Sequence, residues 1–185
     1  MRTAVIVVDM LADTLDQNEY PITPCARAIV PGINALCAWA REQGHPVVFA
    51  CDSFLPGDFI FTGRMKPHSL RGTPESEPSR LLDRKPGDAV LPKRRFSAFY
   101  KTDLDQSLRS WGVSEVAVCG IATQICVLST ALDAVANDFR ATMIEDCTAS
   151  FKPEQHRATL DLYRKGPLHP LLQVLSADRY MDAGA

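Results

Sequence analysis

The feature that most constrains the fold is a series of short, unbroken apolar runs, rich in β-branched residues, that recur along the chain. We predict strands in these runs, at residues 3–9, 46–52, 89–91, 115–120 and 140–145. A strand that faces water on one side alternates apolar and polar residues, whereas a strand that is buried on both faces is apolar throughout. The runs therefore predict a parallel sheet that is covered on both faces.

Amphipathic stretches separate the runs and predict helices at residues 25–43, 103–111, 124–137 and 153–165. Glycine, which commonly ends a helix, follows three of them, at Gly44, Gly112 and Gly166. Strands that alternate with helices are joined by right-handed crossovers. We therefore expect an α/β fold with an open, mostly parallel sheet and helices on both faces, a Rossmann-like three-layer α/β/α arrangement, in a single domain over residues 1–185.

The composition limits the partners. The formal net charge is −2, and acidic and basic residues are interspersed. A chain of this kind offers no extended basic face, so we expect binding neither to nucleic acid nor to a membrane, and we expect a small molecule or copies of the chain as partners. The apolar run at residues 4–8 is too short for a signal peptide. We therefore expect a cytoplasmic protein whose six cysteines are reduced thiols.

Residues 54–87 interrupt the alternation with five prolines and little periodicity. Long loops in compact domains often carry function, although a loop that only covers a sheet edge is the alternative. Three of its cations could meet a substrate carboxylate or simply be solvated, and they are Arg64, Lys66 and Arg71. Apolar side chains here and nearby are candidates for pocket walls or for a subunit contact, and they are Leu15, Phe54, Phe59 and Phe61.

Polar and reactive side chains follow the predicted strands where each strand ends. They are Asp9, Asp52, Lys93, Cys126 and Asp146, one for each of the five strands. The carboxyl ends of parallel strands meet at one edge of the sheet, and ligands of such folds bind there. The sequence therefore predicts a site at this edge.

Cys126 is the candidate nucleophile. Residues 120–126 leave a strand, turn at small residues and open a helix, so Cys126 would lie in the first helical turn. The positive end of the helix dipole favours a thiolate, and the N–H groups of the first turn can donate to an oxyanion. The alternative is an inert core cysteine, which is the interpretation we give to Cys37, Cys51 and Cys119.

A thiol that attacks an amide needs a base, and Asp9 is the best candidate. It follows the buried run at residues 5–8, where desolvation would raise its pKa. An Asp that merely caps a turn after a strand explains the position equally well. Lys93 could hold Asp9 and Cys126 ionised, but a Lys-Arg-Arg run is also typical of a solvated face.

Three segments together resemble the isochorismatase-like cysteine hydrolases, a family that includes nicotinamidases, N-carbamoylsarcosine amidase and ureidoacrylate amidohydrolases. Residues 4–10 resemble the strand with the catalytic Asp9, Lys93 with residues 96–99 resembles the lysine motif, and residues 120–127 resemble the nucleophile motif around Cys126. The three motifs occur in the family's order and span nearly the whole chain. The resemblance favours the catalytic interpretation of Asp9 and Lys93.

The resemblance implies a cysteine hydrolase that cleaves the C–N bond of a small amide through a thioester, either nicotinamidase-like or N-carbamoyl amidase-like. In this reaction Asp9 takes the thiol proton, Cys126 attacks the carbonyl carbon and Lys93 stabilises the charged partners. It also implies a cis peptide bond at Ile121–Ala122 that aims the Ala122 and Cys126 N–H groups at the oxyanion, and a homodimer or homotetramer. The alternative is a small-molecule-binding protein on the same fold with reduced catalysis, and Phe54 would be its first sign.

The sequence departs from the family at the metal site. Metal-dependent nicotinamidases carry Asp-x-His after the second strand and a further His in the following loop. Here the motif is Asp52-Ser53-Phe54, while His68 matches the second His. A zinc site usually needs three protein ligands, so the resemblance to carbamoyl amidases favours an enzyme that requires no cofactor. A divalent metal such as zinc at a partial site made by Asp52 and His68 is the alternative. The other histidines fit no motif and are expected at the surface or beside helices, and they are His45, His156 and His169.

Overall fold

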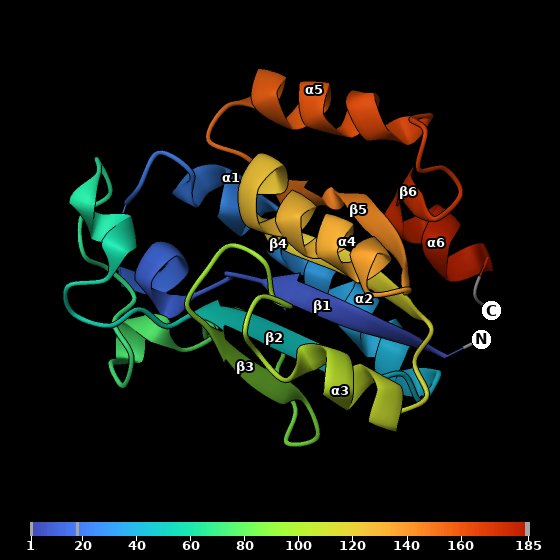
Figure 1. The fold of residues 1–185 in the computed structure, drawn as a ribbon, viewed down its shortest axis with the longest axis horizontal. Coiled ribbons are helices and arrows are strands. Elements are labelled where there is room, and N and C mark those ends of the chain that lie inside the picture. Colours follow the sequence, from blue (N-terminus) through green and yellow to red (C-terminus); the bar gives the residue numbers. More distant parts are fainter. Residues whose placement is uncertain (1, 18, 184–185) are drawn as a thin grey trace.

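A computed structural model describes residues 2–17 and 19–183. Its six strands form one parallel sheet in the order β3-β2-β1-β4-β5-β6 (Figure 1). The strands are β1 (Thr3–Val8), β2 (Val47–Asp52), β3 (Ala89–Lys93), β4 (Glu115–Ile121), β5 (Arg140–Ala149) and β6 (Leu172–Leu175). The predicted α/β class with a parallel sheet is confirmed.

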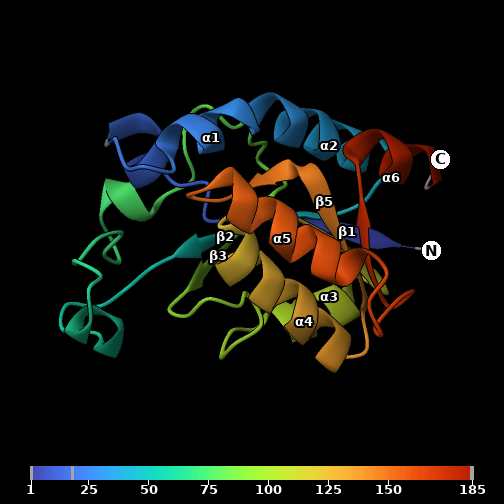
Figure 2. The ribbon, with the colours of Figure 1, turned by 90° about the horizontal axis from the view of Figure 1, so that it is seen from above.

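Helices cover both faces of the sheet (Figure 2). One face carries α1 (Thr23–Ala28), α2 (Val30–Glu42) and α6 (Ala177–Ala183), and the other carries α3 (Leu104–Ser110), α4 (Leu128–Ala136) and α5 (Pro153–Arg164). Shorter helical turns lie at Asp13–Gln17, Phe59–Thr62, Pro74–Ser76 and Thr123–Val127. None of the described helices is long and apolar enough to cross a membrane.

The strand β1 shows why its sequence is apolar throughout. Val5 and Val7 pack into the core under α1 and α2, while Ala4, Ile6 and Val8 pack into the core on the opposite face. All five side chains are at most 1% exposed. An unbroken apolar run is therefore what a central strand between two helical layers requires.

The structure corrects two of the predicted elements and adds two that were not predicted. The helix predicted at residues 25–43 is two helices, α1 and α2, and Pro31 lies in the first turn of the second. Proline has no N–H to donate, so it is tolerated where a helix begins and not in its interior. The strand predicted at residues 140–145 continues to Ala149, and β6 and α6, of four and seven residues, were not predicted.

The strand order determines where a ligand can bind. After β1, the chain adds β2 and β3 on one side, and it then crosses β1 to add β4, β5 and β6 on the other. The crossover connections therefore leave β1 and β4 in opposite directions. Such a switch point opens a crevice at the carboxyl ends of the two strands, and Asp9 and the segment before Cys126 lie there.

Candidate active site

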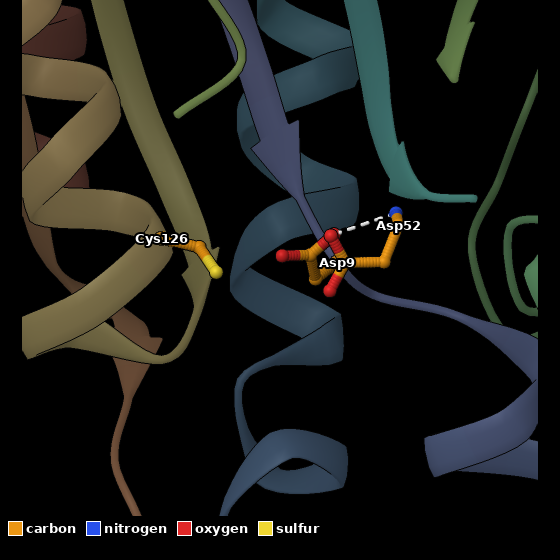
Figure 3. A group of neighbouring side chains, drawn as sticks. All are labelled: Asp9, Asp52 and Cys126. Carbon is orange, nitrogen blue, oxygen red and sulfur yellow. Dashed lines mark hydrogen bonds between the residues drawn. The ribbon is translucent and has the colours of Figure 1, made fainter. Parts of the chain in front are cut away.

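Asp9 directly follows β1 and is 6% exposed. Its backbone has a positive φ of 52°, and its N–H donates to the carbonyl oxygen of Ala50 at 2.9 Å. The carboxylate oxygen Oδ1 accepts the Asp52 N–H at 2.9 Å, which is the dashed line in Figure 3. The side chain is thus held by the end of the neighbouring strand β2 and does not cap a turn of its own.

Lys93 is the last residue of β3, and its side chain is completely buried. Its Nζ donates to Asp9 Oδ2 at 2.8 Å, to Asp52 Oδ1 at 2.6 Å and to the carbonyl oxygen of Arg95 at 3.2 Å. The solvated-face interpretation is therefore wrong for Lys93. One ammonium group joins two carboxylates beneath the strand ends.

The charges of this cluster depend on one another. Burial acts to lower the pKa of Lys93, but Asp52, Asp9 and Cys126 together raise it well above its usual value, so the ammonium form persists. Burial, with a further contribution from Asp9, raises the pKa of Asp52 to about 6, although Lys93 opposes the change. Two carboxylates that share one cation cannot both ionise as easily as they would in water.

Cys126 lies in the π-helical turn Thr123–Val127, which leads from β4 into α4. Figure 3 shows its Sγ pointing toward Asp9 across the crevice. The Sγ and one carboxylate oxygen each from Asp9 and Asp52 all lie within 4.8 Å of one another. The structure thus brings together the four residues expected after the first four strands.

The thiol of Cys126 is neutral at rest. Burial raises its pKa well above the usual value, and Asp9 and Asp52 add to this effect while Lys93 opposes it. This direction is opposite to the one expected from the start of the helix alone. A nucleophilic role for this cysteine requires a neighbouring base to take the proton.

The turn before Cys126 has an unusual backbone. The Ile121–Ala122 peptide bond is cis, as the resemblance implied. The carbonyl oxygen of Ala122 accepts the N–H groups of Ile125 and Val127 at 3.0 and 3.3 Å. The Ala122 N–H itself has no hydrogen-bond partner in residues 2–17 and 19–183, and Ala122 lines the cavity next to Cys126.

Sequence reasoning missed a residue that supports this turn. The hydroxyl of Thr123 and the Nδ1 of His156, on α5, lie 2.9 Å apart and share a hydrogen bond. His156 was expected only at the surface or beside a helix because it matches no motif. A contact between residues 33 positions apart gives no signal in the sequence.

Asp146 does not belong to the site. It was expected to follow the fifth strand, but β5 continues past it, and its carboxylate accepts the N–H of Ala177 at 2.8 Å. His45 packs edge-on against Trp39, and His169 is exposed. Four strands, not five, therefore supply the cluster.

A cavity of about 610 Å³ opens above Asp9, Asp52 and Cys126. Of the predicted wall residues, Phe54 lines it, Phe61 packs edge-on against Phe54, and Phe59 is 79% exposed. Leu15 is buried in the core away from the lining. Two of the loop cations also line the cavity, Arg64 and Lys66, whereas Arg71 donates to the hydroxyl of Ser53 at 3.0 Å.

Phe54 is fixed by the loop that it begins. Its N–H donates to the carbonyl oxygen of Ser69 at 3.1 Å, and its carbonyl oxygen accepts the N–H of Arg71 at 2.8 Å. The rings of Phe54, Phe61 and His68 pack edge to face, with centroids 5.2 to 5.8 Å apart. The loop therefore encloses one side of the cavity in addition to covering the sheet edge.

The residues present do not fit a divalent cation. Asp52 and His68 both line the cavity, but within residues 2–17 and 19–183 no third ligand joins them. Among the residues that the structure describes, the one close group of potential ligands is Asp9, Asp52 and Cys126, and the Lys93 ammonium already binds both of its carboxylates. A cation placed there would face a positive charge a few ångströms away.

Comparisons with known proteins agree with this geometry. The protein-family model described as "Isochorismatase domain" matches residues 3–178. The ureidoacrylate amidohydrolase of Pseudomonas syringae is 31% identical over 83% of this chain and 73% of its own length. A probable inactive nicotinamidase of Arabidopsis thaliana is 30% identical over 96% of both chains.

Solved structures share the fold. N-carbamoylsarcosine amidase from Thermoplasma acidophilum superposes with a TM-score of 0.82 at 31% identity, over 96% of this chain and 98% of that one. A pyrazinamidase of Pyrococcus horikoshii in complex with zinc superposes with a TM-score of 0.80 at 26% identity, over 95% and 99%. The relatives thus include amidases and amidohydrolases, which act on C–N bonds, and at least one that binds zinc.

Proposed function

Because this chain belongs to the isochorismatase family, we propose that it is a cysteine hydrolase that cleaves the C–N bond of a small amide. The catalytic residues in this proposal are Asp9, Lys93 and Cys126. The observation that carries it is the contact group at the switch point, where the Cys126 thiol and the Asp9 carboxylate face each other beside a cavity. Nucleophile and base within reach of each other are the minimum that thiol-based amide hydrolysis needs.

In the first step the Asp9 carboxylate takes the thiol proton while Sγ of Cys126 attacks the amide carbonyl carbon. The neutral resting thiol makes this transfer necessary. The carbonyl oxygen becomes an oxyanion, and the unpaired Ala122 N–H next to Ile121 is the donor we assign to it, together with the N–H of Cys126. Such donors lower the barrier because they are in place before the charge develops.

In the second step the tetrahedral intermediate collapses, the C–N bond breaks and the leaving nitrogen takes the proton from Asp9. For a primary amide, ammonia departs and a thioester on Cys126 remains. Asp9 then takes a proton from water, hydroxide attacks the thioester carbonyl, and the released sulfur regains the proton. The products are a carboxylic acid and ammonia, and Asp9 ends in its starting state.

Lys93 compensates the negative charges that change during these proton transfers. Its ammonium group donates to the Asp9 carboxylate at 2.8 Å, and it compensates the negative charge that develops on sulfur. Asp52 holds Lys93 in place from the other side at 2.6 Å. We assign Asp52 a positioning role and give it no part in the bond-breaking steps.

We propose that the reaction requires no metal. Phe54 stands where the resemblance to metal-dependent relatives implies a His, and among the described residues no third ligand joins Asp52 and His68. We also propose that residues 1–185 act as one domain, in the cytoplasm, as a homodimer or homotetramer. Light scattering on the purified chain would measure the mass of the assembly.

The test is ammonia release from a panel of primary amides and N-carbamoyl compounds, measured with and without a chelator. We expect turnover by the wild-type chain that is unaffected by the chelator and is lost in Cys126→Ala and Asp9→Asn. The matched control is Cys25→Ala, because Cys25 is partly buried and lies outside the cavity lining.

Two results would contradict the proposal. Turnover that survives in Cys126→Ala would remove the nucleophile from the mechanism. An unreactive Cys126 together with tight binding of intact amides would favour the alternative, a small-molecule-binding protein with reduced catalysis. Loss of activity on chelation, restored by zinc, would contradict the metal-free part alone.

A further inference from the structure

The cavity above Cys126 is large for a small amide. Its volume of about 610 Å³ lies in the middle of the range in which proteins enclose drug-sized ligands, roughly 300–1,000 Å³. A primary amide with a single ring would leave much of this space to water. The size of the cavity therefore carries information about the body of the substrate.

The walls of the cavity are mostly apolar. Large hydrocarbon side chains come from several separate segments, and they are Ile22, Phe54, Ile60, Met65, Phe96 and Phe151. Two of them, Phe96 and Phe151, are 41% and 46% exposed although they face the cavity. Aromatic side chains that stay exposed around a hollow lose contact with water when an apolar ligand enters, and this loss favours binding.

The charges around the cavity constrain the charge of the substrate. The carboxylates at its base, Asp9 and Asp52, are both engaged by Lys93. On the loop side, Arg64 and Lys66 line the cavity, and neither has an ion-pair partner within residues 2–17 and 19–183. A positively charged substrate would meet these two cations, and like charges disfavour binding.

We propose that the preferred substrate is a primary amide with a bulky apolar acyl group, larger than one aromatic ring and without positive charge. This inference rests on the amide hydrolysis proposed above and specifies its substrate class. The amide group reaches Cys126 and the Ala122 N–H at the polar base, while the hydrocarbon body fills the space between Phe54, Phe96 and Phe151.

The experiment compares acetamide, benzamide and 2-naphthamide by the rate of ammonia release. Each buried methylene-sized group contributes a factor of about 4 in binding. We therefore expect kcat/KM to rise at least about tenfold at each step of the series. We also expect 4-(aminomethyl)benzamide, which carries an ammonium group, to be a poorer substrate than benzamide.

A pair of variants tests the wall directly. In Phe151→Ser the preference for 2-naphthamide over acetamide should fall about tenfold, mainly through a higher KM, because a lining ring is lost. The matched control is Phe59→Ser, which makes the same change at a side chain that is 79% exposed and outside the lining. This control should keep the wild-type preference.

Calorimetry of the same amides binding to Cys126→Ala tests the inferred substrate class independently of the proposed hydrolysis. Affinity that rises from acetamide to 2-naphthamide supports the inference even if no amide is hydrolysed, in which case only the proposed function fails. Turnover without any preference for the larger acyl groups, matched by equal affinities, would overturn the inference and leave the amide hydrolysis intact. If neither turnover nor graded binding is observed, both are wrong.

Discussion

Gly120 lies against the backbone of Val8, and a β-carbon built on it would stand 2.1 Å from the Val8 carbonyl oxygen. The two residues are paired in the sheet, at the carboxyl ends of β4 and β1. Asp9 directly follows Val8, and the turn that carries Cys126 begins shortly after Gly120. The close approach of these two strand ends thus sets the separation between the thiol and the carboxylate.

Replacing Gly120 by alanine should therefore destabilise the fold. The residue has a φ of +106°, which L side chains rarely adopt, and the added carbon would overlap backbone atoms that cannot move aside. We expect Gly120→Ala to lower the free energy of unfolding by about 3 kcal/mol or more. Gly112→Ala is the matched control, because Gly112 also has a positive φ but has open space around it, and it should cost about 1 kcal/mol. Urea denaturation measures both variants, and an equal loss in the free energy of unfolding would contradict the steric explanation.

Removing the charge of Lys93 should destabilise the fold, because its two buried carboxylate partners lose their counter-ion. In Lys93→Met, the Asp9 and Asp52 carboxylates lose their cation, and we expect a loss of about 3–5 kcal/mol in the free energy of unfolding at pH 8. The control Lys85→Met removes an exposed cation paired with Asp83 and should change stability by less than about 1 kcal/mol.

The loss caused by Lys93→Met should shrink as the pH falls. The pKa of Asp52 in the folded state, about 6, is already above its usual value, and removing Lys93 takes away a lowering influence and raises it further. A carboxyl group whose folded pKa is raised favours folding most below its unfolded pKa, and this contribution is lost as the pH rises through the folded value. Urea denaturation at pH 8 and pH 5 measures the difference, and a loss that does not change with pH would contradict the explanation.

The rate of alkylation of Cys126 should keep rising with pH and reach no plateau below pH 9. Burial and the two carboxylates raise the pKa of the thiol well above its usual value, so the thiolate fraction keeps increasing through pH 9. We expect the iodoacetamide rate to rise over the whole range from pH 6 to 9, and to be higher at pH 7 in Asp9→Asn, which lacks one of the two carboxylates that raise the thiol pKa. Mass spectrometry of the labelled peptide measures both rates. A plateau below pH 7 would indicate a stable thiolate and would contradict the role of Asp9.

If the missing third ligand is what prevents metal binding, Phe54→His should create a zinc site. The new imidazole would join Asp52 and His68, which already line the cavity, and bring the set to three ligands. We expect about one zinc per chain in this variant after dialysis and far less in the wild type. Phe61→His serves as the control, because Phe61 packs beside Phe54 but does not line the cavity. Equal zinc binding by the wild type would contradict this explanation.

The sequence by itself determined the fold class and most of the site. An apolar strand can be recognised because burial on both faces leaves no polar position, as in Ala4 to Val8. Residues that follow parallel strands must meet at one edge, so Asp9, Lys93 and Cys126 could be grouped before any coordinates were known. Backbone topology alone brings these three residues together, and this is why local patterns were sufficient.

Only the tertiary structure decided the protonation states and the limits of the site. The neutral thiol of Cys126 follows from its burial beside two carboxylates, and burial depends on every element packed around it. The exclusion of Asp146 follows from the continuation of β5 to Ala149, where Thr148 and Ala149 pair with β4. The support from His156 comes from a helix packed across the nucleophile turn. These properties arise from contacts between segments far apart in the chain, and a pattern within one segment cannot encode them.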